Sequence, residues 1–347
     1  MQMKLTFLFV FISLSLAACK EKEIPKPPVA PTPTTFFRGA DISWLSQMEA
    51  TGYVFYDEDG NVADCIDLLM ARGINAVRLR VFVHPSAHKT NGHCSPEETA
   101  IMAARAKAKG LDVMIDFHYS DTWADPAHQA KPATWAAVPF ESLKDSVYAH
   151  TQYTLNLLKS VGVTPKWVQI GNEIPSGMLW PEGHINNPAQ LAALINTGNQ
   201  AVKDVDQSIQ TIVHIDQGND NARFRWFYDL MQAQGANFDI IGASYYPYWL
   251  GSDYTVTIND LGANLKDMSL RYHKPTMIVE VGGDYWQVEN SKELLIATIG
   301  AALDVPNEQC QGVFYWEPQG AKPWSGYQLN CWQDNGKPSA ALDAFLY

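Results

Sequence analysis

Two glutamates, each at the end of a predicted strand, could together perform acid and base chemistry. Residues 167–170 predict a short strand that stops at Gly171, and Glu173 stands just beyond it. The apolar run 275–279 predicts a second strand, which Glu280 closes. In a barrel of parallel strands, chemistry is built at the carboxyl ends of the strands. Two carboxyl groups there suit glycoside hydrolysis, in which one protonates the leaving oxygen and the other attacks the sugar or activates water.

The two carboxyl groups would need different protonation states. Glu173 would be the general acid, which must hold a proton near neutral pH, and Glu280 would be the ionised nucleophile. An inward arginine, Arg78 or Arg80, could keep Glu280 charged, because a nearby cation favours the carboxylate form. Asn172 could donate a hydrogen bond to the sugar hydroxyl beside the reacting carbon. The spacing of these residues therefore predicts a retaining or inverting two-acid site.

Further polar and aromatic residues are expected on the same rim, at the ends of other strands and in the loops that follow them. The predicted substrate-binding residues are Asp41, Arg78, Arg80, His118, Asp121, Asn172, His214, Asp216, Tyr246 and Trp316. Trp316, and the loop residues Trp123, Trp180 and Trp249, could offer flat faces to the apolar side of a pyranose ring. The convergence of charged and aromatic groups on one end of a barrel favours a binding site.

Each of these residues also has a purely structural explanation. Arg78 and Arg80 could fill the barrel as an ion-paired layer with Asp41 or Asp116. For one of the two arginines, this structural role is at least as good an explanation as contact with the substrate. His118 and His214 could be hydrogen-bonded core histidines, and the loop tryptophans could pack long loops. These explanations would all have to hold together on one rim, and that favours the site.

Predicted strands and helices alternate from residue 36 to the C-terminus. The strands are 36–42, 76–83, 113–118, 167–170, 211–215, 239–244, 275–280 and 312–316. The helices are 62–71, 96–108, 140–158, 188–205, 222–234, 258–272, 291–303 and a short closing helix from Ser339. No shift in composition marks a domain boundary, so residues 36–347 are expected to form a single-domain α/β fold, a (β/α)8 TIM barrel. An open doubly wound sheet is disfavoured, because no Gly-x-Gly-x-x-Gly follows the first strand.

The first 35 residues predict export and anchoring. Residues 1–18 carry one cation and then an apolar stretch shorter than the ~20 residues of a membrane span, which is typical of a signal peptide. Cys19, which follows Leu-Ala-Ala, resembles the lipidated cysteine of a bacterial lipobox; an ordinary signal cleaved after small residues is the alternative. The proline-rich residues 19–35 predict a semi-rigid tether. We expect an exported protein held by lipid at the cell envelope, on the outer membrane or cell surface.

Composition limits the partners. Lys and Arg number 25 against 37 Asp and Glu, so the formal net charge is −12, which repels phosphate backbones and argues against nucleic acid. A hydrophobic content of 46% is enough for a sizeable core. Nothing indicates an obligate interface, so we expect a monomer that acts on a polysaccharide.

The cysteines fit an exported protein. Besides Cys19 they are Cys65, Cys94, Cys310 and Cys331, and none belongs to a Cys-x-x-Cys pair, so a zinc site is not expected. The simplest pairing is Cys65 with Cys94 and Cys310 with Cys331. The other connectivities and free buried thiols remain open alternatives.

Several motifs together resemble the endo-β-1,4-galactanases of glycoside hydrolase family 53. They are Asp-Phe-His-Tyr-Ser-Asp-Thr-Trp-Ala-Asp-Pro-Ala-His-Gln at 116–129, Ile-Gly-Asn-Glu-Ile at 170–174, Phe-Tyr-Trp-Glu-Pro at 314–318, Val-Arg-Leu-Arg-Val at 77–81 and Ser-Tyr-Tyr-Pro at 244–247. The likeness runs from Arg38 nearly to the end. The first motif is highly specific, whereas Asn-Glu alone is shared by a clan of retaining barrels. The resemblance implies a (β/α)8 fold, retention of configuration, Glu173 as acid/base, Glu280 as nucleophile, and β-1,4-galactan of pectic side chains as substrate.

Some positions depart from the family pattern. Val281 stands where the family usually has Thr, and Asn219 stands where relatives often place an aromatic, which leaves one sugar-stacking contact in question. Some bacterial members hold calcium after the nucleophile strand. Here residues 281–290 offer only Asp284 and Glu289 as acids, too few for the six to eight oxygen ligands of calcium. We expect no metal and no cofactor.

The leading hypothesis is a retaining, endo-acting galactanase. A non-catalytic galactan-binding lipoprotein is the alternative from another class, and a retaining barrel hydrolase of another β-glycan, such as a mannanase or cellulase, is a third interpretation. The presence of both Glu173 and Glu280 favours an enzyme, because a binding protein needs no pair of acids at reacting distance.

Overall fold

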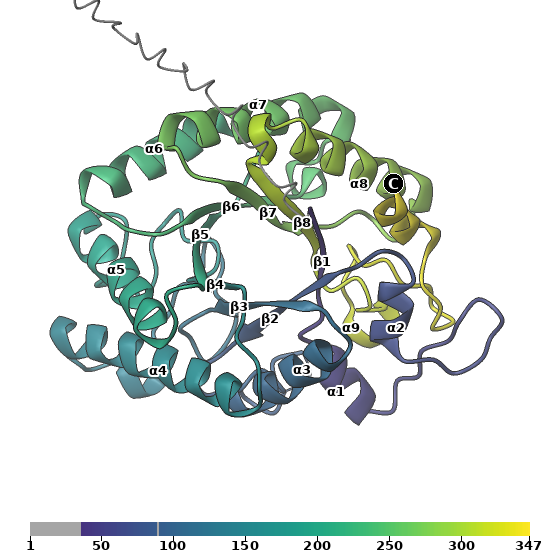
Figure 1. Cartoon of the computed structure of the whole chain (residues 1–347), viewed down its shortest axis with the longest axis horizontal. Coiled ribbons are helices and arrows are strands. Elements are labelled where there is room, and N and C mark those ends of the chain that lie inside the picture. Colours follow the sequence, from purple (N-terminus) through teal and green to yellow (C-terminus); the bar gives the residue numbers. More distant parts are fainter. Residues whose placement is uncertain (1–35, 89) are drawn as a thin grey trace, which may run out of the picture. The chain divides into compact units, whose positions relative to one another are not determined.

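The computed structural model describes residues 36–88 and 90–347 (Figure 1). The predicted signal peptide (1–18), Cys19, which we expect to carry lipid, and the predicted tether (19–35) lie outside the described residues. Within the described part of the chain, no helix is both long enough and apolar enough to cross a bilayer.

The described residues fold as a closed barrel of parallel strands in sequence order, in which the first strand pairs with the last. The strands are β1 (Phe37–Asp41), β2 (Ala76–Val81), β3 (Asp112–Phe117), β4 (Trp167–Ile170), β5 (Gln210–Ile215), β6 (Ile240–Tyr245), β7 (Thr276–Val281) and β8 (Cys310–Tyr315). Figure 1 shows them as a ring with the long helices outside it. The predicted (β/α)8 barrel is confirmed, with strand ends that differ by a residue or two from those expected.

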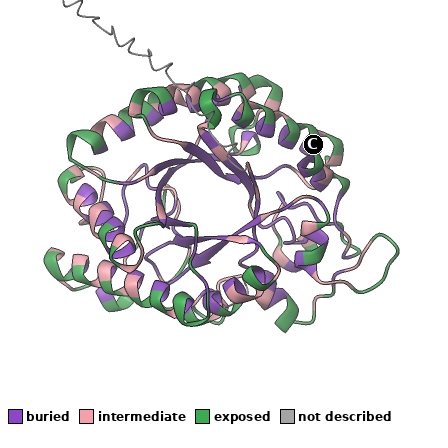
Figure 2. Cartoon of the chain, viewed as in Figure 1, coloured by how far each residue is buried: buried purple, intermediate pink, exposed green. Residues whose placement is uncertain are grey.

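The helices cover the outside of the barrel. They are α1 (Leu45–Ala50), α2 (Cys65–Met70), α3 (Pro96–Ala108), α4 (Phe140–Ser160), α5 (Pro188–Val205), α6 (Asn221–Ala233), α7 (Tyr254–Tyr272), α8 (Val288–Leu303) and α9 (Lys322–Ser325), and a 3₁₀ helix (Ala340–Leu346) closes the chain. Several begin where a short polar side chain satisfies free backbone N–H groups. Ser95 and Glu98 form a capping box on α3, and Asp253 accepts from Thr255 N at the start of α7. Figure 2 shows that these helices turn their buried faces inward and their exposed faces to solvent.

The interior of the barrel is layered. The layer nearest the amino ends of the strands is apolar and takes residues from every strand: Phe37, Ala76, Met114, Trp167, Ile212, Ile240, Met277, Val279 and Phe314. A Cβ at Gly39 would lie 2.1 Å from the Phe314 ring, so glycine leaves the room that this ring fills. Two residues further along several strands the inward side chains are polar and fully buried, among them Arg78, Asp116 and His214. The apolar layer therefore closes the barrel beneath a charged one.

A bulge in β7 turns Glu280 into the barrel. Met277 and Val279 point into the interior layer, while Ile278 and Val281 pack in the outer core beneath the helices. Strict alternation would then send Glu280 outward. The pairing of β7 with β6 shifts register, so that Ile278 pairs with Ala243 but Glu280 pairs with the very next residue of β6, Ser244. A bulge of this kind re-aims a side chain, and here the carboxylate joins the charged layer.

The predicted disulfides are wrong. Cys65, Cys94, Cys310 and Cys331 are buried free thiols. Burial raises the pKa of Cys94 and of Cys331 to about 12, so both stay protonated. Their surroundings are packed core, where a free cysteine behaves as a small apolar residue.

Candidate active site

Glu173 stands just past the end of β4 on an unusual backbone. Gly171 has φ +76°, and Glu173 itself has φ +42°, a left-handed backbone conformation that residues other than glycine rarely adopt. The carboxyl group accepts a hydrogen bond at Oε1 from Ser244 Oγ, at 2.6 Å. Ser244 Oγ also lies 2.7 Å from His214 Nε2. Because the serine hydroxyl donates to Glu173, His214 must donate to the serine, which leaves Glu173 Oε2 free of these contacts.

Glu280 is clamped by two donors. Arg78 Nη2 lies 2.9 Å from Glu280 Oε1, and Tyr246 OH donates to Oε2 at 3.0 Å. The Arg78 side chain is fully buried and also meets Asp41 at 2.9 Å and Asp116 at 2.8 Å. Arg78 therefore forms the predicted ion-paired layer inside the barrel and is also the cation in contact with Glu280. The structural and the functional interpretation of this arginine both apply.

The environments of the two glutamates give their carboxyl groups different pKa values. Burial and the neighbouring Glu280 raise the pKa of Glu173 well above its usual value. Burial also raises the pKa of Glu280 to about 7, but Arg78 and the Tyr246 hydroxyl oppose that shift. Since Glu280 has a cation in contact and Glu173 has only a neutral hydroxyl, Glu280 loses its proton first as the pH rises.

The buried layer around Arg78 also contains the neutral side chains of Asn172 and two histidines. Asn172 Oδ1 accepts from Arg78 Nη2 at 2.9 Å, and its Nδ2 donates to Ala124 O at 2.8 Å, which leaves one amide hydrogen for a ligand. His118 Nε2 lies 3.0 Å from Asp116 Oδ2, and His118 Nδ1 accepts from Ala124 N at 2.9 Å. Burial lowers the pKa of His118, and that of His214 further, so both imidazoles are neutral. His118 is thus tied into the core.

A cavity of about 230 Å³ opens beside Glu173. Asp216, Ser244, Tyr246 and Trp249 line it together with residues of the loop after β5. Arg223 of α6 holds Asp216 with contacts of 2.8 to 3.1 Å. Trp249 is 63% exposed, so the loop after β6 gives this cavity an exposed aromatic side.

Asn219 lines the same cavity. Its Oδ1 atom is buried without a hydrogen-bond partner among the described residues. The cavity therefore offers one unused acceptor from Asn219 and one aromatic face from Trp249.

An aromatic wall surrounds Arg80. Its guanidinium carbon lies 4.2 Å from the centre of the Trp123 ring and 5.9 Å from that of Trp316, and Nη1 donates to Glu317 Oε1 at 2.5 Å. Trp44 packs edge-on against Trp316, with ring centres 5.0 Å apart. Arg80 is 1% exposed, so it positions the tryptophans and is itself screened from a ligand.

The structure brings most of the predicted site residues together, but not all of them. Asp41, Arg78, Asn172, His214, Asp216 and Tyr246 gather around the two glutamates or one contact away, and Trp316 lies on the aromatic wall. Asp121 instead accepts from His84 N at 3.0 Å and from Ala133 N at 2.9 Å, and so ties two loops together. Trp180 donates from its indole to Ser176 O at 3.0 Å and meets Ala130 in an isolated bridge.

Sequence reasoning did not select Ser244 and Glu317, which contact Glu173 and Arg80. Ser244 had a usable signal, because it precedes Tyr246 by two positions and so shares a strand face with it. Glu317 lies in the Phe-Tyr-Trp-Glu-Pro motif next to Trp316, but nothing in the motif indicates that its carboxylate turns inward to an arginine.

No metal centre is evident in the described part of the chain. Within residues 36–88 and 90–347, no group of three or more His, Cys, Asp or Glu side chains is placed to hold a metal ion. The expectation that none is required stays a prediction.

Comparison with known proteins identifies the family. The model of glycosyl hydrolase family 53 matches residues 37–345. An arabinogalactan endo-β-1,4-galactanase of Thermothelomyces thermophilus is 34% identical over 303 residues, which cover 81% of this chain and 89% of that protein. The family 53 catalytic domain of Ignisphaera aggregans superposes with a TM-score of 0.82 at 30% identity, over 92% of this chain and 98% of that one. A fungal β-1,4-galactanase structure gives a TM-score of 0.81 at 30% identity, over 89% and 98%. The chain therefore belongs to glycosyl hydrolase family 53 and is a glycoside hydrolase.

Proposed function

We infer that the protein is a retaining endo-β-1,4-galactanase that cleaves pectic galactan, the backbone of type I arabinogalactan. The observation that carries this inference is that the two glutamates have different hydrogen-bond and ion-pair partners. Glu280 meets Arg78 and Tyr246, whereas Glu173 meets a serine hydroxyl and has its pKa raised well above its usual value. An ionised nucleophile beside a protonated acid is what the first step of retaining hydrolysis requires.

In the first step, Glu280 attacks the anomeric carbon as the glycosidic bond breaks. Glu173 gives its proton to the leaving oxygen, and this proton is assigned to Oε2 because Oε1 accepts from Ser244. The product is a galactosyl ester on Glu280 and a shortened chain with a new hydroxyl. In the second step, Glu173 is a carboxylate and takes a proton from water, which attacks the same carbon and frees Glu280.

The inferred substrate rests on the relatives. The relative from Thermothelomyces thermophilus is named for arabinogalactan, and the fungal structure is named for β-1,4-galactan. The cavity between Glu173 and Trp249 combines carboxyl, amide and aromatic groups, which suits a polyhydroxylated ring with one apolar face. A galactan-binding lipoprotein without activity is the weaker alternative, because binding alone gives no reason to hold Glu280 with two donors.

The test is the release of reducing ends from potato or lupin galactan, with mannan, cellulose and xylan as a substrate panel. Galactan should be cleaved in preference, and Glu280→Gln should lower turnover by several orders of magnitude while galactan binding persists. Following the anomer of the first product by NMR checks retention. Activity on another glycan alone would change the substrate, and near-normal activity of Glu280→Gln would remove this residue from the mechanism.

We also infer that the enzyme is a monomer anchored by lipid at the cell envelope. This inference rests on Cys19 after an apolar leader and on the proline-rich residues 19–35. Cys19→Ala should shift the protein from the membrane fraction to the soluble fraction. Unchanged partitioning would defeat the lipoprotein assignment, and size-exclusion chromatography of the released protein checks the monomer.

A further inference from the structure

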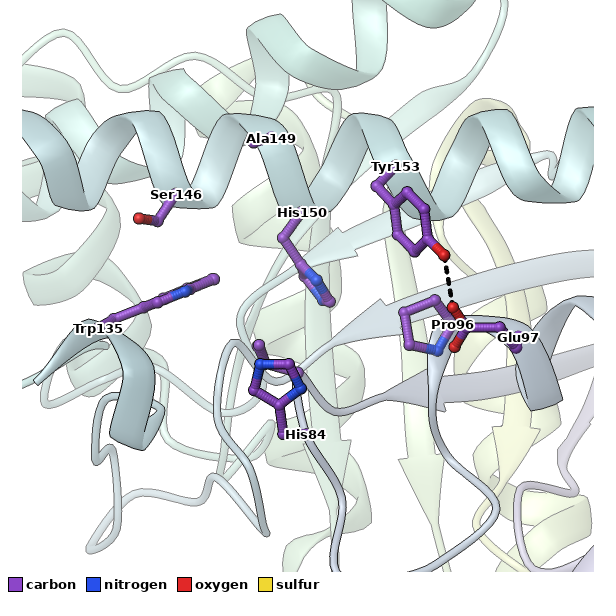
Figure 3. Close-up of a pocket in the computed structure, with 9 residues that line it drawn as sticks. His84, Pro96, Glu97, Trp135, Ser146, Ala149, His150 and Tyr153 are labelled. Atoms are coloured by element: carbon purple, nitrogen blue, oxygen red, sulfur yellow. Dashed lines mark hydrogen bonds between the residues drawn. The ribbon is translucent and has the colours of Figure 1, made fainter.

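A second cavity lies outside the barrel, where the proposed chemistry uses no residue. Its volume is about 520 Å³, within the usual range of ligand pockets, and it lies between α3, α4 and the loops that follow β2 and β3. Its polar and aromatic lining consists of His84, Glu97, Trp135, Ser146, His150 and Tyr153. Figure 3 shows these side chains converging from α4 above and from the two loops and α3 below.

His150 presents an unused nitrogen. Its Nε2 atom is buried and has no hydrogen-bond partner among the described residues. The ring is fixed edge-on between Trp135 and Phe117, with ring centres 5.9 and 5.6 Å away. Burial lowers the pKa of His150 to about 4, so the imidazole is neutral near pH 7. A buried polar atom without a partner is destabilising, and a ligand or water in the cavity would relieve that cost.

The other polar groups on the wall are mainly hydrogen-bond acceptors. Tyr153 OH donates to Glu97 Oε1 at 2.5 Å, which leaves the tyrosine oxygen and the second carboxylate oxygen as acceptors. Ser146 Oγ donates to Ser142 O at 2.8 Å and can still accept. The lining has one charged group, Glu97, and it is already bonded to Tyr153. Such a wall suits a neutral ligand that brings several O–H donors.

The cavity also has aromatic surface. The Tyr153 side chain is 53% exposed, and the Trp135 indole closes the opposite side in Figure 3. Aromatic faces next to hydroxyl-accepting groups are the combination that holds a pyranose ring. The segment between β3 and α4 connects this cavity to the active site, because it supplies Trp135 here and Trp123 to the aromatic wall around Arg80.

We propose that this cavity is a second glycan-binding site, which holds a galactosyl unit of the polymer while another part of the same chain occupies the active site. This proposal rests on the proposed galactanase function. Two sites on one protein that engage one polymer raise the apparent affinity without any new contact at the reacting bond. The second site should therefore matter for long galactan and not for short oligosaccharides.

The test fills the cavity without touching the catalytic residues. Ala149 lines the cavity from an exposed position on α4, so Ala149→Trp should block it. His150→Phe keeps the packing of the ring and removes the nitrogen. Asn156→Trp places the same bulk at another exposed position of α4 outside the lining and is the matched control.

We expect both cavity variants to raise KM on polymeric galactan roughly tenfold and to weaken retention in galactan-containing gels. Their kcat/KM on a short galacto-oligosaccharide should stay within about twofold of wild type, as should every value for Asn156→Trp. Unchanged KM and retention in both cavity variants, or equal losses on short and long substrates, would overturn the proposal. If wild type releases no reducing ends from galactan, the proposed function itself fails, which is a different result.

Discussion

Replacing Tyr246 by Phe tests how Glu280 is kept ionised. The change removes one hydroxyl, which donates to Glu280 Oε2 at 3.0 Å, and keeps the ring. A hydrogen bond to a charged acceptor contributes about 1.5–3 kcal/mol. One pKa unit corresponds to about 1.36 kcal/mol, so the loss should raise the pKa of Glu280 by about 1–2 units. Arg78 remains in contact and should keep the rise from being larger.

The sign of the effect on activity follows from the role proposed for Glu280. The reaction needs this carboxylate ionised, and a higher pKa means that a higher pH is required to ionise it. The acidic limb of the kcat/KM profile should therefore move up by about 1–2 pH units. The basic limb, which reflects the loss of the proton from Glu173, should move little, because the Tyr246 hydroxyl donates to Glu280 whereas Glu173 accepts from Ser244. Initial rates of reducing-end release from galactan across the pH range measure both limbs.

The neighbouring residue supplies a matched control. Tyr245 points to the other side of β6, where its hydroxyl lies 2.9 Å from Thr257 Oγ1 and 3.3 Å from Tyr254 O. Tyr245→Phe removes the same hydroxyl from a site without a titrating partner and should leave both limbs in place. An acidic limb that does not move in Tyr246→Phe, or that moves equally in both variants, would refute the reasoning.

Three other outcomes can be checked independently. Glu173→Ala should lose hydrolysis of galactan but keep activity on substrates with good leaving groups, with partial rescue by azide; failure of both would count against Glu173 as the proton donor. Glu317→Gln should lower the free energy of unfolding by about 3–5 kcal/mol in urea titrations, because it leaves the buried Arg80 without its closest counter-ion, whereas the exposed Glu289→Gln should change it little. A reducing agent should leave Tm unchanged, since Cys65, Cys94, Cys310 and Cys331 are free; a drop of several degrees would reveal a disulfide.

The fold was predictable because local signals and global topology agree. Period-two alternation in 76–83 placed Arg78 and Arg80 on one face, and both arginines point into the barrel. Pro96 marked the first residue of α3, and β4 has the bounds that its glycine stop implied. Polar residues at strand ends were then bound to meet, because a closed parallel barrel puts those ends on one rim.

The details of the site depend on contacts that no local pattern encodes. Alternation along β7 sends Glu280 outward, and only the bulge opposite Ser244 brings it to Arg78. Asp121 sits in the most specific motif of the chain, yet it accepts from two loop amides. The cysteine pairing was drawn from expected compartment and even number, whereas the thiols pack separately in the core. In each case a register shift or a packing choice between distant segments decides where the side chain points.

The charge balance inside the barrel explains why one proton stays in the site and where it resides. Arg78 faces Asp41, Asp116 and Glu280. Arg80 faces Glu317 and lies 3.6 Å from Asp41, so four carboxylates share two cations. The nearby histidines add no positive charge, because burial lowers the pKa of both. A further ionised carboxyl group would increase an excess that is already negative and poorly solvated, and this cost falls on the carboxyl group without a cation. That group is Glu173. The ion pairs that fill the barrel thus also hold Glu173 in its protonated form, so stabilising the charged core and preparing the first step of the proposed mechanism depend on the same arginine.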